Sequence, residues 1–229
     1  MPIELIAADD MSSDSVEDDN ETKKRFEYVI NYFQKKNPNP TTELKHKNGF
    51  ELLVAVILSA QTQDSRVNMV TPKLFEKYPT PEALAKATSD DVYKYIGSVN
   101  YAGNKSDYLV RTANILVTKY GGKIPENTND LQTLPGVGRK TAHVVMATLF
   151  NKPVIAVDTH VTRVSERIGL TTDAKNPLEV EEQLVRYTPK EVMPKISHWL
   201  ILHGRYICRA KDPQCKKCDI RSVCRYYTT

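Results

Sequence analysis

A glycine-rich turn in the middle of the chain constrains the fold more than any other segment. Residues 134–142 are Leu-Pro-Gly-Val-Gly-Arg-Lys-Thr-Ala, and the apolar run of residues 142–150 follows directly. Before the turn, Leu131 and Leu134 lie three residues apart, which is the spacing of one helix face. The pattern predicts a helix, a tight turn and a second helix.

The turn also suggests a binding surface. Gly136 and Gly138 carry no Cβ, so another molecule can approach the backbone closely. Amides of the turn and of the next helix start would point outward as an anion site. The backbone around Val137 and Arg139 belongs to the same candidate site. A simple turn between two packed helices, with Lys140 as a solvated charge, is the alternative interpretation.

Lys140 falls in the first turn of the second predicted helix. The positive helix end and neighbouring Arg139 both disfavour an ammonium group, and so favour the nucleophilic free amine. Eighteen residues later, Asp158 follows an apolar stretch and precedes apolar residues at helical spacing, which predicts an N-cap. A carboxylate at that helix start could also face Lys140 across a cleft and exchange protons with it.

Helical patterns continue along the whole chain. An apolar stripe lies between Phe26 and Phe33, and residues 50–60 are apolar on all sides, which predicts a buried helix. Further helices are predicted over residues 89–96 and 104–120, each closed by glycine. Pro72 falls inside an apparent helix and predicts a kink or a break. With no hairpin or βαβ pattern, the sequence predicts an all-α fold.

Charge is distributed unevenly along the 229 residues. Residues 1–21 hold eight acids and no Lys or Arg, so the rest of the chain carries a formal charge of +12 against +4 for the whole. The acidic head is expected to be a disordered tail. A basic body suits a polyanion such as nucleic acid, although ordinary solubility charge would also explain it. No apolar run approaches the ~20 residues of a membrane span, and no signal peptide is recognisable.

All four cysteines lie near the C-terminus with the spacing C-x6-C-x2-C-x5-C; they are Cys208, Cys215, Cys218 and Cys224. Four thiols so close together, without a secretory signal, favour a metal centre over disulfides. Structural zinc usually uses two short C-x2–4-C pairs, and only one is present here. The longer loops therefore favour an iron–sulfur cluster. Lys and Arg crowd the same segment and could contact phosphates, or could simply offset a negative cluster.

With these motifs placed, the chain resembles the endonuclease III family of helix-hairpin-helix DNA glycosylases from about residue 22 to its end. The resemblance also rests on Phe-Glu-Leu-Leu at 50–53, Leu-Ser-Ala-Gln at 58–61 and His-Trp-Leu-Ile-Leu-His-Gly-Arg at 198–205. It implies two helical lobes with DNA in the cleft between them. A six-helix barrel with the helix-hairpin-helix is expected over residues 42–152. Residues 22–41 plus 153–229 would form the terminal lobe with the cluster loop.

The resemblance implies a role for particular residues. Lys140 would be the catalytic amine, Asp158 its carboxylate partner, and the four cysteines the ligands of a [4Fe–4S] cluster. Gln61 resembles the residue that fills the gap left by a flipped nucleotide. Tyr101 stands where the family often has a leucine wedge, which is a departure, although a tyrosine there could stack on bases. From the residues alone, Gln61 could instead cap the buried helix, and Tyr101 could be an ordinary surface tyrosine.

The implied activity is that of a bifunctional DNA glycosylase and abasic-site lyase of base excision repair. It would act as a monomer on double-stranded DNA and remove oxidised pyrimidines through a lysine Schiff base and β-elimination. A monofunctional mismatch glycosylase is an alternative, but such relatives lack the amine found here at Lys140. A non-catalytic helix-hairpin-helix DNA-binding protein is another, but it has no need of Lys140 paired with Asp158. We expect no membrane partner and, in a prokaryote, a cytoplasmic, nucleoid-associated location.

Overall fold

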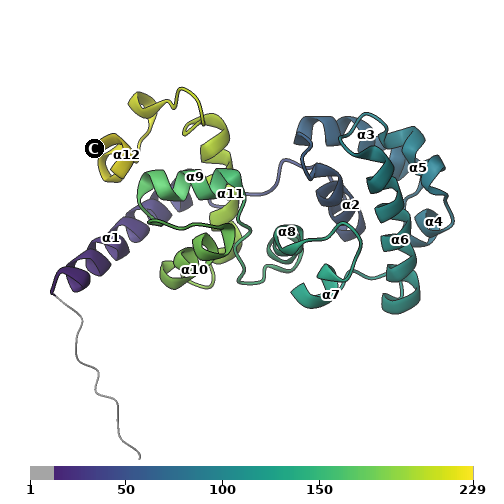
Figure 1. Ribbon diagram of the computed structural model, residues 1–229, viewed down its shortest axis with the longest axis horizontal. Coiled ribbons are helices and arrows are strands. Elements are labelled where there is room, and N and C mark those ends of the chain that lie inside the picture. The colour runs from purple at the N-terminus through teal and green to yellow at the C-terminus, as the bar shows by residue number, and fades with distance from the viewer. Residues whose placement is uncertain (1–12, 229) are drawn as a thin grey trace, which may run out of the picture.

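The computed structural model describes residues 13–228; residues 1–12 and residue 229 lie outside the described part of the chain. Within these bounds the chain forms twelve α-helices and two short 3-10 helices. The all-α fold predicted from the sequence is therefore confirmed. The helices gather in two lobes that lie side by side (Figure 1).

The first lobe contains the middle of the chain. Its helices are α2 (Gly49–Ser59), α3 (Asp64–Lys77), α4 (Pro81–Ala85), α5 (Ser89–Ile96), α6 (Ala102–Tyr120), α7 (Thr128–Gln132) and α8 (Arg139–Phe150). The centre of this lobe is α2, in which every residue from Phe50 to Leu58 is buried. A helix that is apolar on all sides must be enclosed, and α3, α6 and α8 pack around it.

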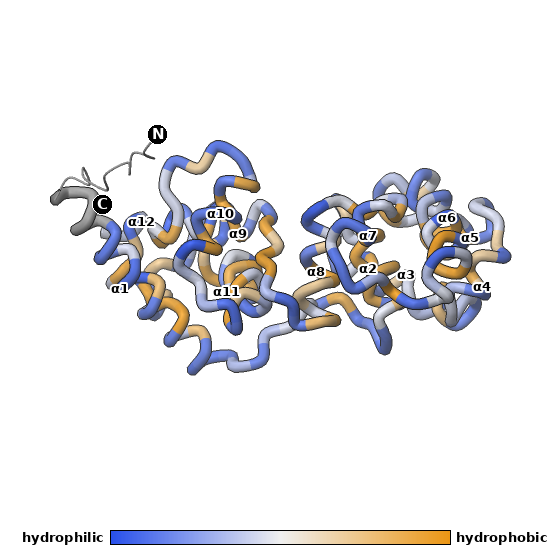
Figure 2. The backbone as a smooth tube through the Cα atoms, turned by 90° about the horizontal axis from the view of Figure 1, so that it is seen from below, coloured by the Kyte–Doolittle hydropathy of each residue, from blue (hydrophilic) through white to orange (hydrophobic). Residues whose placement is uncertain are grey.

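The second lobe combines the two ends of the chain. Its helices are α1 (Ser13–Lys36), α9 (Thr159–Ile168), α10 (Pro177–Tyr187), α11 (Met193–Tyr206), the 3-10 helices η1 (Cys215–Lys217) and η2 (Arg221–Val223), and α12 (Arg225–Thr228). The Phe33 ring of α1 stacks on Trp199 of α11 with a centroid distance of 5.8 Å. Apolar segments gather in the interior of each lobe (Figure 2). No described helix is long and apolar enough to cross a membrane.

Residues 37–48 and 151–158 connect the lobes. The second connection is held on both sides, because the His143 Nδ1 of α8 lies 3.1 Å from the Ile155 carbonyl oxygen. The Ala156 amide donates to Ser197 Oγ of α11 at 2.8 Å. These buried contacts fix the segment that ends at Asp158 against both lobes.

Two expectations differ from the structure. Of the kink or break expected at Pro72, the break is absent, because helix α3 runs through this residue. The carbonyl that loses its amide donor is that of Asn68, four residues earlier, and Asn68 is only half-buried, so water can reach this turn of the helix. The expected disordered tail, residues 1–21, falls partly outside the described residues, but from Ser13 onward it belongs to α1. Asp19 is held there by Lys23 at 2.6 Å and by the Tyr187 hydroxyl at 2.5 Å.

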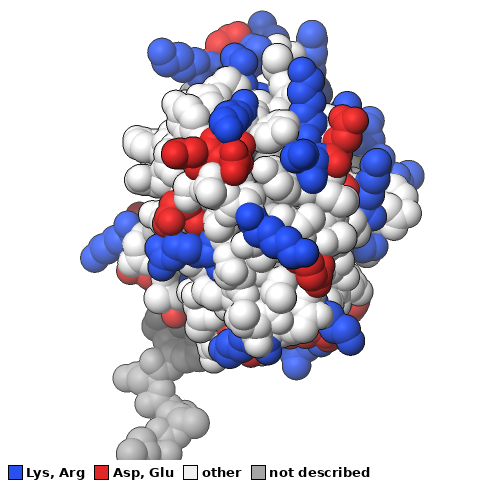
Figure 3. All heavy atoms as spheres, turned by 90° about the vertical axis from the view of Figure 1, so that its right-hand side faces the viewer, with Lys and Arg blue, Asp and Glu red and all other residues white. Residues whose placement is uncertain are grey.

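Charges are mixed on the outer end of the first lobe. Figure 3 faces the end away from the second lobe, and basic and acidic side chains are interspersed there. This end therefore carries no patch of a single sign.

Candidate active site

The glycine turn joins α7 to α8 and uses its two glycines differently. Gly136 has φ +78°, and a Cβ there would lie 3.0 Å from Tyr108 and 3.1 Å from Ile57. Gly138 has φ −88°, and a Cβ there would meet nothing within 4 Å. Gly136 is thus required by the shape and packing of the turn. Only Gly138 leaves open space in front of the backbone.

The backbone amides of the turn also differ in their hydrogen bonding. Val137 is buried, and its amide donates to the Leu134 carbonyl at 3.1 Å, so Val137 anchors the turn. Gly138 is the N-cap of α8 and offers no side chain to cap the helix. The first amides of α8 therefore lack an intrahelical acceptor and face outward. This geometry suits an anion at Gly138 better than one at Val137.

Lys140 and Asp158 come together from the two lobes. Lys140 is in the first turn of α8, and its Nζ lies 3.5 Å from Asp158 Oδ2. Asp158 is the N-cap of α9, because its Oδ1 accepts from the amides of His160 at 2.8 Å and Val161 at 2.9 Å. Asp158 therefore has both predicted roles. Its Oδ1 caps α9, and its Oδ2 faces the lysine amine.

The environment keeps Asp158 ionised. Burial alone would raise the pKa of Asp158, but the Lys140 ammonium and the capping amides outweigh it and hold this pKa below its ordinary value. His160 Nδ1 lies 3.6 Å from Asp158 Oδ2 and has no hydrogen-bond partner. Burial lowers the pKa of His160, which favours its neutral form. The lysine is then the positively charged group closest to the carboxylate.

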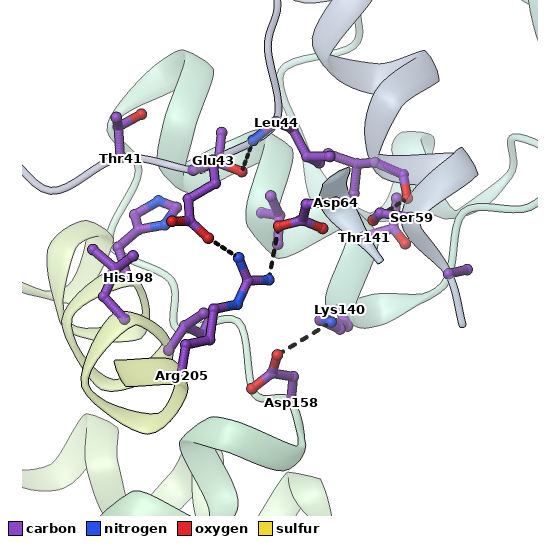
Figure 4. A pocket seen from close by; sticks show the side chains of 16 residues that line it. Thr41, Glu43, Leu44, Ser59, Asp64, Lys140, Thr141, Asp158, His198 and Arg205 are labelled. Carbon is purple, nitrogen blue, oxygen red and sulfur yellow. Dashed lines mark hydrogen bonds and ion pairs between the residues drawn. The ribbon is translucent and has the colours of Figure 1, made fainter. Parts of the chain in front are cut away.

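A pocket of about 110 Å³ opens beside this pair, between the lobes. Arg205 of α11 crosses it and ion-pairs with Glu43 and, at 2.7 Å, with Asp64 (Figure 4). The remaining lining includes the hydroxyls of Thr41, Thr42, Ser59 and Thr141. Apolar side chains make up the larger part of the wall, among them Leu44, Val56, Val144 and Ile201. The pocket is thus mostly apolar with charged groups across it, and Lys140 is on its wall. Sequence reasoning missed Glu43 and Asp64 as site residues and assigned Arg205 only to the basic segment around the cysteines, since only the fold brings the linker, α3 and α11 together.

Gln61 and Tyr101 are exposed on neighbouring loops of the first lobe, outside this pocket. Both have left-handed backbones, with φ +55° and +58°. The Asn100 side chain donates to the Gln61 carbonyl, so the two loops touch. Gln61 lies beyond the C-cap of α2, which is Ala60. The side chain that binds the end of α2 is Lys105, a residue that the sequence analysis did not single out.

Arg139 does not stand free beside the turn. Its guanidinium makes a two-pronged ion pair with Glu181 of α10, at 2.9 and 2.7 Å. The pair raises the pKa of Arg139 and links α8 to the second lobe. Arg139 is half exposed, so its outer edge can still face a polyanion.

The four cysteines line one pocket beside η1, η2 and the end of α11. Burial, and then the proximity of the other cysteines, raises the pKa of the Cys218 and Cys224 thiols. Arg167 contacts two members of the set, with Nη1 3.6 Å from Cys208 Sγ and its carbonyl 3.2 Å from Cys224 Sγ. Among the described residues, no three His, Cys, Asp or Glu side chains are placed to hold a metal ion.

Comparison with known proteins gives consistent results. The HhH-GPD superfamily of base excision DNA repair proteins matches residues 54–190. Endonuclease III of Rickettsia felis is 45% identical over 201 residues, which cover 88% of this chain and 94% of the relative. Endonuclease III of Escherichia coli is 43% identical over 203 residues, covering 89% and 95%.

Solved structures show the same likeness. A trapped covalent intermediate of endonuclease III with DNA matches with a TM-score of 0.84 and 42% identity, over 90% of this chain and 97% of that chain. A thermostable thymine-DNA glycosylase matches with a TM-score of 0.80 but only 24% identity, over 91% and 98%. At this identity, the match to the thymine-DNA glycosylase shows a shared fold alone.

Proposed function

This chain belongs to the endonuclease III family of the HhH-GPD superfamily of base excision DNA repair proteins, and we propose that this DNA glycosylase and abasic-site lyase works through Lys140. The observation that carries the proposal is the Lys140 Nζ, 3.5 Å from a capped carboxylate at the edge of an interlobe pocket. A structural ion pair needs no open pocket beside it, whereas a nucleophile needs room for a substrate next to the attacking atom.

The reaction begins with a nucleotide turned out of the duplex, because the sugar carbon cannot be reached inside it. Lys140 attacks the sugar C1′ as its free amine, and Asp158 accepts the proton that the nitrogen loses once the new bond has formed. The N–C1′ bond forms as the bond from C1′ to the base breaks, and the base leaves with its electron pair and takes up a proton. Asp158 also stabilises positive charge that develops at C1′.

The lyase step follows from the same bond. Ring opening gives an imine between Lys140 and C1′, which acidifies the C2′ proton. A base removes that proton, a C2′–C3′ double bond forms, and the 3′ phosphate leaves. Asp158, held by two amides 2.8 and 2.9 Å from its Oδ1, is the nearest carboxylate to the amine and can carry protons through these steps.

Oxidised pyrimidines are the proposed substrate class. A saturated or oxidised ring stacks poorly, so it leaves the duplex at lower cost, and it is a better leaving group than an intact base. The pocket beside Lys140 has hydrogen-bonding groups from Arg205, Asp64 and Thr42 on its walls. Such groups suit the added hydroxyl and carbonyl groups of an oxidised base.

The cysteine pocket has the donor set of a [4Fe–4S] cluster. Four thiols lie on the wall of one pocket, and four cysteine thiolates are the ligands that such a cluster takes. Cys208, Cys215, Cys218 and Cys224 would hold the iron atoms as thiolates. Bound there, the cluster would join the loop after α11 to α12 and stiffen the basic segment between them.

The two buried clusters support a division of the chain for which we propose the limits 42–152 and 22–41 plus 153–229. Apolar residues from Leu44 to Met146 form one cluster, and those of α1 and α9–α11 form the other. Each core is contiguous, which is the property expected of a domain.

Trapping with borohydride on a duplex with one abasic site tests the proposed mechanism. Reduction of the imine should leave protein and DNA covalently joined, and mass spectrometry should place the DNA on Lys140. Neither a monofunctional glycosylase nor a non-catalytic binding protein would form the adduct on this substrate, so its absence contradicts the proposal. A second duplex with one oxidised pyrimidine separates the two, because only the glycosylase would release the base.

A further inference from the structure

Lys105 is a buried lysine that the proposed chemistry does not use. It lies on α6, and only 4% of its surface is exposed. Its Nζ donates to the Leu58 carbonyl at 2.8 Å, the Ala60 carbonyl at 2.6 Å and Thr62 Oγ1 at 3.0 Å. An ammonium has three donors, and all three are engaged. The ammonium group therefore binds backbone carbonyls at the end of α2.

These bonds determine the path of the loop that carries Gln61. Leu58 and Ala60 belong to the C-terminal end of α2, where carbonyls lack amide partners and a cation is favourable. The next residue, Gln61, has φ +55°, a conformation that a residue with a Cβ adopts only when its surroundings hold it there. Lys105 binds this loop on both sides of Gln61, through the Ala60 carbonyl before it and the Thr62 hydroxyl after it.

The loop that carries Tyr101 is linked to the Lys105 ammonium through Thr62. Tyr101 also has a left-handed backbone, with φ +58°, and its carbonyl accepts the first backbone bond of α6. Asn100 completes the connection, because its amide donates to Thr62 Oγ1 at 3.2 Å and its side chain donates to the Gln61 carbonyl. Two exposed side chains from separate loops are thereby held in a fixed relation.

We propose that Lys105 is a positioning residue that joins the Gln61 and Tyr101 loops into one rigid, two-pronged insertion element for duplex DNA. The inference rests on the proposed function, in which a nucleotide leaves the duplex, and it takes Gln61 and Tyr101 as the exposed side chains that would fill the vacated space. Filling that space needs both prongs at a set separation before the DNA arrives. A rigid element lowers the ordering cost of insertion. Lys105 touches no reacting atom, so its effect is confined to substrates in which a paired duplex must be opened.

The experiment compares Lys105→Met with the unaltered full-length protein on one abasic site in two settings. In the first the site is in a continuous duplex, and in the second the same strand is single. Under single-turnover conditions the duplex rate should fall by roughly 10- to 100-fold, since a ~1 Å misplacement can cost about 100-fold. The single-strand rate should change by less than about twofold, within the range of surface substitutions. Lys94→Met, an exposed lysine on α5, is the matched control and should change neither rate.

Two further variants keep the test decisive if Lys105→Met folds poorly. Thr62→Val has nearly the same shape and removes the oxygen that accepts from both Lys105 and Asn100, so it should show the same duplex-specific loss in weaker form. Gln61→Ala should not add to the loss caused by Lys105→Met, because both remove one insertion element. Equal losses on duplex and single strand for both Lys105→Met and Thr62→Val overturn the inference and leave Lys105 as a support of the fold.

A binding measurement separates this inference from the lyase mechanism. A 2-aminopurine base placed opposite the abasic site reports insertion through its change in fluorescence, and no bond is cleaved. The unaltered protein should change the signal, while Lys105→Met should bind with at most half of that change. An undiminished signal overturns the inference. Absence of cleavage by the unaltered protein, with the fluorescence pattern as expected, contradicts the lysine mechanism alone.

Discussion

Lys140 Nζ lies 3.5 Å from Asp158 Oδ2, and the two residues stand at the first turn of α8 and the cap of α9, in different lobes. The two side chains of the pair differ in exposure and in the number of bonds that hold them. Asp158 is 13% exposed and held by two amides through its other oxygen, whereas Lys140 is 53% exposed. The carboxylate is thus a fixed acceptor, and the lysine is the member that can swing toward a substrate.

Removing the amine should abolish the covalent chemistry and leave binding largely intact. Lys140→Ala should give no borohydride adduct and no strand cleavage. Its affinity for DNA should remain, with the slope of log K against log salt reduced by about one unit, as for one lost phosphate contact. Lys119→Ala, another exposed lysine of the first lobe, is the control. An adduct formed by Lys140→Ala at the normal rate would show that the nucleophile is another residue.

Replacing the carboxylate by an amide should separate chemistry from capping. Asn is about as good an N-cap as Asp, so Asp158→Asn should keep the bonds to the amides of His160 and Val161 and melt within a few degrees of the unaltered protein. Turnover should fall by ~10²–10⁴-fold, the range for a positioned acid–base group. Normal turnover in this variant would reduce Asp158 to a helix cap.

The same substitution gives a prediction for stability against pH. The pKa of Asp158 is lower in the folded protein than in the unfolded chain, so its charge stabilises the fold above the unfolded pKa of about 3.9. That stabilisation is lost as pH falls through the folded pKa. The unfolding free energy of the unaltered protein should exceed that of Asp158→Asn at pH 7, and the difference should shrink below about pH 4. Urea unfolding from pH 3 to 7 measures it, and a constant difference would contradict the ion pair.

The purified protein should be brown and contain about four irons per chain, the content of a [4Fe–4S] cluster. Cys215→Ser removes one of the four thiols of the cysteine pocket and should lower the iron content and the visible absorbance together. DNA affinity should fall as the segment between Cys208 and Cys224 loosens, with the fold of the first lobe retained. A colourless, active protein with one zinc per chain would refute this assignment.

Local signals placed the helices well. Helix α5 begins and ends where the sequence predicts, at Ser89 and Ile96, because Thr88 makes a capping box with Asp91 and Gly97 follows. Asp158 is likewise the predicted cap. Pro72 was harder to place, since whether a proline ends a helix depends on whether the freed carbonyl faces water.

Long-range partners could not be predicted from the sequence. Arg205 meets Glu43 and Asp64 across more than 140 positions, and nothing in the local pattern of any of them indicates the contact. Lys105 did leave a signal, because it shares one helix face with buried Ala102 and Leu109. A lysine on a buried face needs oxygen partners, but only the fold identifies them as the end of α2.

The two glycines of the α7–α8 turn should respond in opposite ways to the same replacement. Gly136→Ser places a Cβ at φ +78° against Tyr108 and Ile57, so it should destabilise the fold by at least ~1–2 kcal/mol, the cost of a left-handed backbone alone.

Gly138→Ser should leave stability equal or higher, because the site is open, φ is −88° and serine is a good N-cap. Its hydroxyl would accept from the α8 amides that a phosphate needs, so DNA affinity should fall about tenfold, the equivalent of one charge-assisted hydrogen bond of about 1.5 kcal/mol. Thermal melting and DNA titration of both variants decide the matter. If Gly138→Ser binds DNA as well as the unaltered protein, the start of α8 is not the phosphate site.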